Sequence, residues 1–122
     1  MSHSVLVVED HHELRTLIGH LLARHGYDVF CASTVAEAVT RLHETHPPCL
    51  ILWDPTSLPM NSGLITLAGN LGVPIATIPV GIVATGKTAA GLPIIAKKLT
   101  SLEAIVSVLR EHCPLTEAQA PA

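Results

Sequence analysis

The sequence predicts an α/β protein with a doubly wound, parallel five-stranded sheet. Residues 5–8 and 49–53 are apolar runs rich in β-formers and lack the alternation of a half-exposed strand, so we expect strands buried on both faces. Each run ends directly in a carboxylate, at Glu9 and at Asp54. Helical patterns lie between the runs, and such alternation of strands and helices is typical of this fold class.

The first half of the chain shows these elements in order. Apolar residues at helical spacing follow the first strand, and Gly26 is a natural helix stop. Residues 27–32 are predicted to form the second strand. Thr34 and Glu37 then match a capping box at the start of a second helix, and a pair of prolines precedes the third strand. The predicted inward faces of the two helices are Leu14, Leu17, Ile18, Leu21 and Leu22, and Val35, Ala38, Val39 and Leu42.

The second half is unusual because Lys87 is the only charged residue between positions 55 and 96. Its apolar stretch at 64–84 is long enough for a membrane span, but internal prolines and glycines argue against one. We expect a short third helix near 64–71, a fourth strand at 73–78 and a shortened or irregular fourth helix between 80 and 91. A fifth strand before Lys97 and a capped last helix complete the predicted pattern.

Size and composition indicate one cytoplasmic domain. The chain has 122 residues, which we divide into a domain at 1–113 and a flexible tail at 114–122. Its net charge of −3, without a basic stretch, argues against nucleic-acid binding. Glu9 and Asp10 interrupt the early apolar run, which argues against a signal peptide. The three cysteines, at 31, 49 and 113, lack metal-type spacing and are predicted to be reduced packing residues.

Three carboxylates are predicted to meet at one edge of the sheet. Glu9 and Asp10 follow the first strand and Asp54 follows the third, and ligands of open α/β sheets bind beyond the carboxyl ends of the strands. Clustered carboxylates need a cation, and hard oxygen ligands suit Mg²⁺. Lys97, after another short apolar run, is a candidate for a fixed positive charge at the same edge.

This order of residues resembles the receiver domain of two-component response regulators. Residues 5–10 are similar to the first strand and acidic pair of that family, Asp54 to its phosphoacceptor, and Lys97 to the invariant lysine before its last helix. Residues 58–63 are similar to the loop and glycine after the phosphoacceptor, and the whole resemblance covers residues 3–112. It implies a flavodoxin-like fold.

The resemblance also implies a function. A sensor histidine kinase or phosphotransfer protein would supply a phosphoryl group to Asp54, with Mg²⁺ held by Glu9, Asp10, Asp54 and the backbone carbonyl of Thr56, and with Lys97 pairing with a phosphoryl oxygen. Such a protein signals by binding a downstream protein target. Its only expected chemistry is self-catalysed phosphoryl transfer and autodephosphorylation, so it would not be an enzyme in the ordinary sense.

The chain departs from the family pattern at two places. If the fourth strand ends at residue 78, the switch Ser/Thr position falls on Pro79, which has neither a hydroxyl nor an amide hydrogen. If the strand ends instead at Thr85, the hydroxyl is restored but little room remains for a fourth helix. The loop after Asp54 is also one residue longer than usual, which would displace Thr56.

Two alternative functions follow from these departures. The first is a degenerate pseudo-receiver, a protein-interaction module that works without phosphorylation. The second is a small metal-dependent phosphohydrolase, which would need a general acid two residues beyond its nucleophile, where this chain has Thr56.

Two further features bear on binding. The eight histidines are scattered, and only His11 and His12 lie near the predicted acidic pocket, so most are expected to be solvated side chains rather than ligands of a transition metal. The apolar segment 73–99, whose only charged residue before position 97 is Lys87, has too few polar side chains to coat one side of a small domain, which predicts a homodimer or partner interface there. The residues expected to form it are Val80, Ile82, Leu92 and Leu99.

Overall fold

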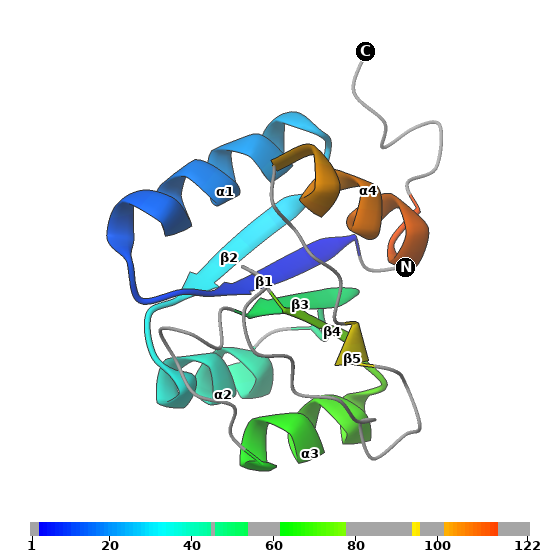
Figure 1. Ribbon diagram of the computed structural model, residues 1–122. Coiled ribbons are helices and arrows are strands. Elements are labelled where there is room, and N and C mark those ends of the chain that lie inside the picture. Colours follow the sequence, from blue (N-terminus) through cyan, green and yellow to red (C-terminus); the bar gives the residue numbers. More distant parts are fainter. Residues whose placement is uncertain (1–2, 45, 54–61, 78–93, 96–101, 115–122) are drawn as a thin grey trace.

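Among the residues that the structure describes, a parallel sheet forms the centre and two helices lie on each of its faces (Figure 1). The computed structural model describes residues 3–44, 46–53, 62–77, 94–95 and 102–114. Its strands are β1 (Ser4–Val8), β2 (Asp28–Ala32), β3 (Leu50–Trp53), β4 (Ile75–Thr77) and β5 (Ile94–Ile95). Its helices are α1 (His12–Arg24), α2 (Val35–Glu44), α3 (Ser62–Leu71) and α4 (Leu102–His112).

The strand order is β2-β1-β3-β4-β5, with all neighbours parallel. This is the flavodoxin-like order, in which the chain changes direction across the sheet between β1 and β3. Four strands have three to five residues, and β5 has two. The predicted parallel α/β architecture with alternating helices is therefore confirmed.

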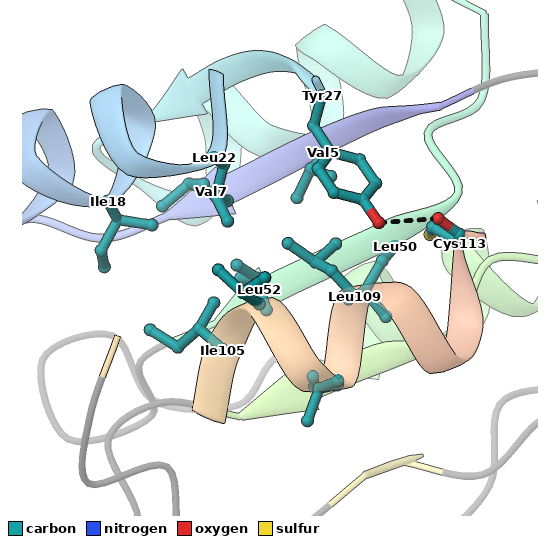
Figure 2. Packing of buried hydrophobic residues seen from close by; sticks show 13 residues of the cluster. Val5, Val7, Ile18, Leu22, Tyr27, Leu50, Leu52, Ile105, Leu109 and Cys113 are labelled. Carbon is teal, nitrogen blue, oxygen red and sulfur yellow. Dashed lines mark hydrogen bonds between the residues drawn. The ribbon is translucent and has the colours of Figure 1, made fainter. Parts of the chain in front are cut away.

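The two faces of the sheet bury two separate apolar clusters, because side chains alternate along a strand. Residues of β1 and β3 at alternate positions point to α1 and α4 on one face, and to α2 and α3 on the other. The first cluster, shown in Figure 2, includes Val5, Val7, Ile18, Leu22, Tyr27, Leu50, Leu52, Ile105 and Leu109. The second includes Leu6, Val8, Ala38, Leu42, Ile51, Trp53, Leu64, Ala68 and Ile75.

Helices α1 and α3 end in the same way. Gly26 and Gly72 have φ angles of 93° and 72°, in the left-handed region that favours glycine. After α1, the amide of Tyr27 donates to the carbonyl of Leu22 (3.1 Å). After α3, the amide of Val73 donates to the carbonyl of Ala68 (2.8 Å). These bonds form Schellman motifs, so the stop predicted at Gly26 is confirmed.

Three expectations need correction or qualification. Leu17 was predicted to face inward but is 53% exposed, because it lies at the margin of the apolar stripe that α1 presents to the sheet. The third helix is not shortened: it begins at Ser62 and has ten residues, as α2 has. The fourth strand lies at 75–77, within the range 73–78, while the predicted fourth helix at 80–91 falls outside the described residues.

The prediction that all three cysteines are reduced is wrong for two of them. Cys49, just before β3, and Cys113, just after α4, form a disulfide with Cα atoms 5.7 Å apart, and Cys31 is free. The two positions are separated by 64 residues in the chain. Only the packing of α4 against the sheet brings them together, so their spacing in the sequence contained no sign of the pair.

Candidate functional site

The acidic pair lies at the carboxyl ends of the strands, directly after β1. Val8 pairs with Trp53 in the parallel register, and the residues that follow these two in the sequence are Glu9 and Asp54. The amide of Glu9 donates to the carbonyl of Ala32 at the end of β2 (3.0 Å), which fixes the backbone there. This is the position at which doubly wound sheets bind ligands.

The two carboxylates have different surroundings. Glu9 is 1% exposed, and its Oε1 accepts a hydrogen bond from the amide of His11 (3.0 Å). Asp10 is exposed. Carboxylate oxygens are hard donors of the kind that Mg²⁺ prefers, so the chemistry of these two side chains suits such an ion, and a magnesium site here stays a prediction.

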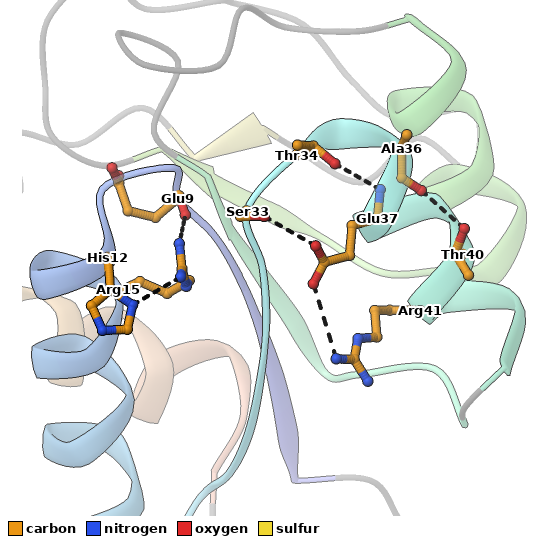
Figure 3. Close-up of polar contacts among 9 residues, drawn as sticks. All are labelled: Glu9, His12, Arg15, Ser33, Thr34, Ala36, Glu37, Thr40 and Arg41. Atoms are coloured by element: carbon orange, nitrogen blue, oxygen red, sulfur yellow. Dashed lines mark hydrogen bonds and ion pairs between the residues drawn. The ribbon is translucent and has the colours of Figure 1, made fainter.

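Arg15 is a member of the site that the sequence reasoning missed. Its Nη1 donates to the carbonyl of Glu9 (2.9 Å; Figure 3). The same nitrogen lies 3.4 Å from the carbonyl of Asp10, so the guanidinium holds the turn that carries both acids. Its Nη2 lies 3.2 Å from Nδ1 of His12. Helical side chains point back toward the amino end of the helix, and an arginine in the first turn after an acid pair is the signal that would have found it.

The histidines near the acids have other partners. His11 is the N-cap of α1, and its Nδ1 accepts the amide of Leu14 (3.3 Å). Because a guanidinium only donates, Nδ1 of His12 is the acceptor in its contact with Arg15. Within the part of the chain that the structure describes, no group of three His, Cys, Asp or Glu side chains is placed to hold a metal ion.

Helix α2 begins at the same edge of the sheet, directly after β2. Thr34 Oγ1 accepts the amide of Glu37 (3.0 Å), as a capping box requires. In a capping box the glutamate accepts the backbone amide of the N-cap residue, here Thr34. The carboxylate of Glu37 accepts the hydroxyl of Ser33 instead (3.0 Å) and lies 4.0 Å from Arg41. The predicted capping box is therefore confirmed for its threonine, while its glutamate binds one residue earlier than predicted (Figure 3).

The other predicted site residues, Asp54, Thr56 and Lys97, lie outside the described residues, as do Pro79 and Thr85. Trp53, the residue before Asp54, is fully buried. The structure thus describes the acidic pair and the ends of β1 and β3. The phosphoacceptor, the lysine and the switch position stay predictions.

No protein-family model matches the chain, and no curated protein matches it. Solved structures do. CheY4, a chemotaxis protein of Vibrio cholerae, is 20% identical, with a TM-score of 0.73 over 92% of this chain and 99% of its own. The receiver domain of the Francisella response regulator 1452 is 17% identical, with a TM-score of 0.69 over 88% of this chain and 93% of its own. This chain has the receiver-domain fold.

A third similar structure extends this likeness to another kind of protein. It is the signal receiver domain of a signal transduction histidine kinase from Syntrophus aciditrophicus, 22% identical, with a TM-score of 0.69 over 92% of this chain and 90% of its own. In this chain the receiver-domain fold places Glu9 and Asp10 at the end of β1, next to the end of β3. Among the described residues, no helix has the length and apolar character needed to cross a membrane.

Proposed function

We propose that the protein is a phosphoacceptor receiver of a two-component phosphorelay. It would accept a phosphoryl group on Asp54 from a phosphohistidine of a sensor kinase or phosphotransfer protein, and signal by binding a downstream protein. The observation that supports this proposal is the pairing of Val8 with Trp53, the two residues that directly precede Glu9 and Asp54 in the sequence. Consecutive Cα atoms are about 3.8 Å apart, so we expect Asp54 to lie close to Trp53 and to the acidic pair.

The transfer requires little covalent chemistry from the protein. A carboxylate oxygen of Asp54 would attack phosphorus, the new P–O bond forming as the P–N bond to the donor imidazole breaks. Positioning and neutralisation of charge account for most of the catalysis in such reactions. Mg²⁺, held by Glu9, Asp10, Asp54 and the Thr56 carbonyl, would supply that neutralisation when bound, with Lys97 as a second cation.

The described residues of this chain prepare the site in two ways. Arg15 ties down the carbonyls of Glu9 and Asp10, so the turn is ordered before any ligand binds. The Glu9 carboxylate is buried and accepts the amide of His11, which fixes one of its oxygens. Both contacts reduce the ordering that ligand binding would otherwise require.

The competing function, a pseudo-receiver, is favoured by Pro79. The fourth strand lies at 75–77, in register with residues 51–53, and so supports the alignment that places proline at the switch position. A receiver with that substitution would still accept a phosphoryl group, but it would respond through contacts other than a switch hydroxyl.

The test is the intact mass after incubation with Mg²⁺ and acetyl phosphate. We expect a gain of one phosphoryl group that is lost in Asp54→Asn and when Mg²⁺ is chelated. Asp28→Asn is the matched control, because it makes the same chemical change at the start of β2. That position lies at the amino ends of the strands, away from the acidic pair, so the variant should keep the mass gain. A gain that survives Asp54→Asn would refute the assignment of the phosphoacceptor, and no gain in any variant would support the pseudo-receiver.

A further inference from the structure

The disulfide between Cys49 and Cys113 lies away from the acidic edge. Cys49 precedes β3 and Cys113 follows α4, so the bond joins the amino end of a central strand to the carboxyl end of the last helix. Glu9 and Asp10 are at the carboxyl ends of the strands. The proposed phosphoryl-transfer site therefore does not involve the cysteine pair, and the pair needs an explanation of its own.

The surroundings of the pair accommodate the reduced state as well as the oxidised one. The Sγ of Cys49 lies 3.2 Å from the carbonyl oxygen of Ser4, to which a thiol at this position donates a hydrogen bond. The amide of Cys49 donates to the same oxygen (2.8 Å). The strand position of Cys49 is thus held by backbone pairing and does not depend on the sulfur–sulfur bond.

The Cys113 end is held independently too. The hydroxyl of Tyr27 donates to the carbonyl of Cys113 (2.8 Å; Figure 2). The amide of Cys113 donates to the carbonyl of Leu109 (2.6 Å). Leu109 is fully buried in the cluster beneath α4. Because none of these contacts involves a sulfur atom, we expect α4 to stay docked when the disulfide opens, with the two sulfurs still close together.

We propose that Cys49 and Cys113 form a reversible thiol–disulfide site that exchanges with low-molecular-weight disulfides and thiols. Cys49 is the entry point, because it is partly exposed whereas Cys113 is only 4% exposed. The Cys49 thiolate attacks one sulfur of a small disulfide such as glutathione disulfide, and one glutathione leaves as a thiolate. The Cys113 thiolate then attacks the Cys49 sulfur and releases the second glutathione. Two protein thiols are oxidised, one glutathione disulfide is reduced, and the departing thiolates take up the protons.

Cys31 provides an internal reference. It is the free cysteine, on the edge strand β2, and burial raises the pKa of its thiol, with Arg15 and Arg41 acting in the opposite direction. A thiol with a raised pKa is a poor nucleophile at neutral pH. We therefore expect Cys31 to remain a thiol while the pair exchanges.

The first experiment counts thiols by alkylation and mass spectrometry after equilibration in glutathione buffers. Oxidising buffer should leave one alkylatable thiol, at Cys31, and reducing buffer should leave three. The oxidised form should melt about 10 °C higher, since the bond closes a long loop in the unfolded chain. Cys31→Ser should not change this shift, and Cys49→Ser should abolish it. Three thiols in oxidising buffer, or one in reducing buffer, would overturn the proposal.

The second experiment tests the entry point with paired variants. In Cys113→Ser, glutathione disulfide should modify Cys49 and the adduct should persist, because no second thiol is present to resolve it. In Cys49→Ser, Cys113 should be modified much more slowly, because it is buried. If Cys49 in folded Cys113→Ser and Cys113 in folded Cys49→Ser were modified at equal rates, Cys49 would not be the entry point.

Discussion

Glu9 and Asp10 are neighbours in the chain but differ in what they contribute. Glu9 is buried and bonded to the His11 amide, and its peptide carbonyl accepts Arg15, so it is part of the turn's structure. Asp10 is exposed, and Arg15 contacts its carbonyl while its carboxylate is at the surface. Of the two acids, Asp10 is therefore the one that can be changed without disturbing the fold.

The first prediction concerns Asp10→Asn. Mg²⁺ should change the emission of Trp53, the single tryptophan, because the proposed ion lies beside that residue. The variant should lose this response while its free energy of unfolding changes by no more than about 0.5 kcal/mol, or rises, because crowded carboxylates repel one another. Urea unfolding measures the free energy of unfolding, and a Mg²⁺ titration measures the change in Trp53 emission. Asp28→Asn is the control in both experiments. Lower stability with an intact Mg²⁺ response would show that Asp10 is structural.

The second prediction concerns Tyr27, the single tyrosine, which is 3% exposed. Burial raises its pKa above the usual 10.0, with the positive charge of Arg110 acting in the opposite direction. The protonated phenol donates to the Cys113 carbonyl, so its contribution to stability is complete below pH 10 and is lost as the pH rises through the folded pKa. The native protein should form tyrosinate at higher pH than the unfolded protein, as absorbance titration would show.

Replacing the tyrosine tests the same contact by stability. Tyr27→Phe removes the hydrogen bond and should lower the free energy of unfolding by about 1–2 kcal/mol at neutral pH. The loss of stability above pH 10 should also be smaller in the variant than in the native protein. Equal stability of the two proteins at neutral pH would mean that the hydroxyl bond contributes little to holding α4.

At the scale of the elements, the helix ends are determined by backbone conformation. Gly72 follows α3 with a φ of +72°, and a Cβ built there has no atom within 4 Å, so only the backbone disfavours a side chain. Gly19 lies inside α1, and a Cβ built there lies at ordinary contact distances of 3.8 Å from Val29 and 3.9 Å from Cys31. Identical substitutions at these two glycines should therefore have opposite effects.

The third prediction uses this pair. Gly72→Ala should lower the free energy of unfolding by about 1 kcal/mol, the cost of a left-handed residue with a Cβ. Gly19→Ala should raise it by about 0.5–1 kcal/mol, because alanine loses less backbone entropy in a helix than glycine. Urea unfolding of both variants measures the difference, and destabilisation by Gly19→Ala would mean that α1 cannot approach β2 with a methyl group between them.

At the scale of the whole molecule, helices cover both faces of the described sheet. Helices α1 and α4 cover one face and α2 and α3 the other (Figure 1), and Leu17 is the one large apolar side chain that is clearly exposed among the described residues. The apolar segment 73–99, in which Lys87, Lys97 and Lys98 are the charged residues, lies mostly outside the described residues. Its role as an interface therefore stays a prediction from composition.

The fourth prediction is that this segment mediates association. Sedimentation at micromolar concentration should show a dimer, and Ile82→Glu or Leu92→Glu should convert it to a monomer by placing a charge in an apolar contact. Leu17→Glu is the matched control, since it makes the same kind of change at an exposed position on α1 and should leave the dimer intact. A native monomer would rule out a homodimer through this segment.

Periodicity and turn chemistry, which are local, were enough to predict most of the fold. Patterns of a few residues predict the buried strand residues 5–8 and 50–53, the stop of α1 at Gly26 and the amino end of α2 at Thr34. The position of the acidic pair was predictable for the same reason, since a carboxylate that follows a buried parallel strand lies at the edge of the sheet.

What only the tertiary structure decided depends on contacts between distant parts of the chain. The Cys49–Cys113 disulfide requires α4 to pack along the sheet, and the exposure of Leu17 depends on how α1 is rotated against it. Arg15 joins the acidic turn because the start of α1 directs its guanidinium back onto the carbonyls of Glu9 and Asp10. Sequence patterns specify which face of an element is apolar, whereas the packing of the elements decides which particular side chains meet.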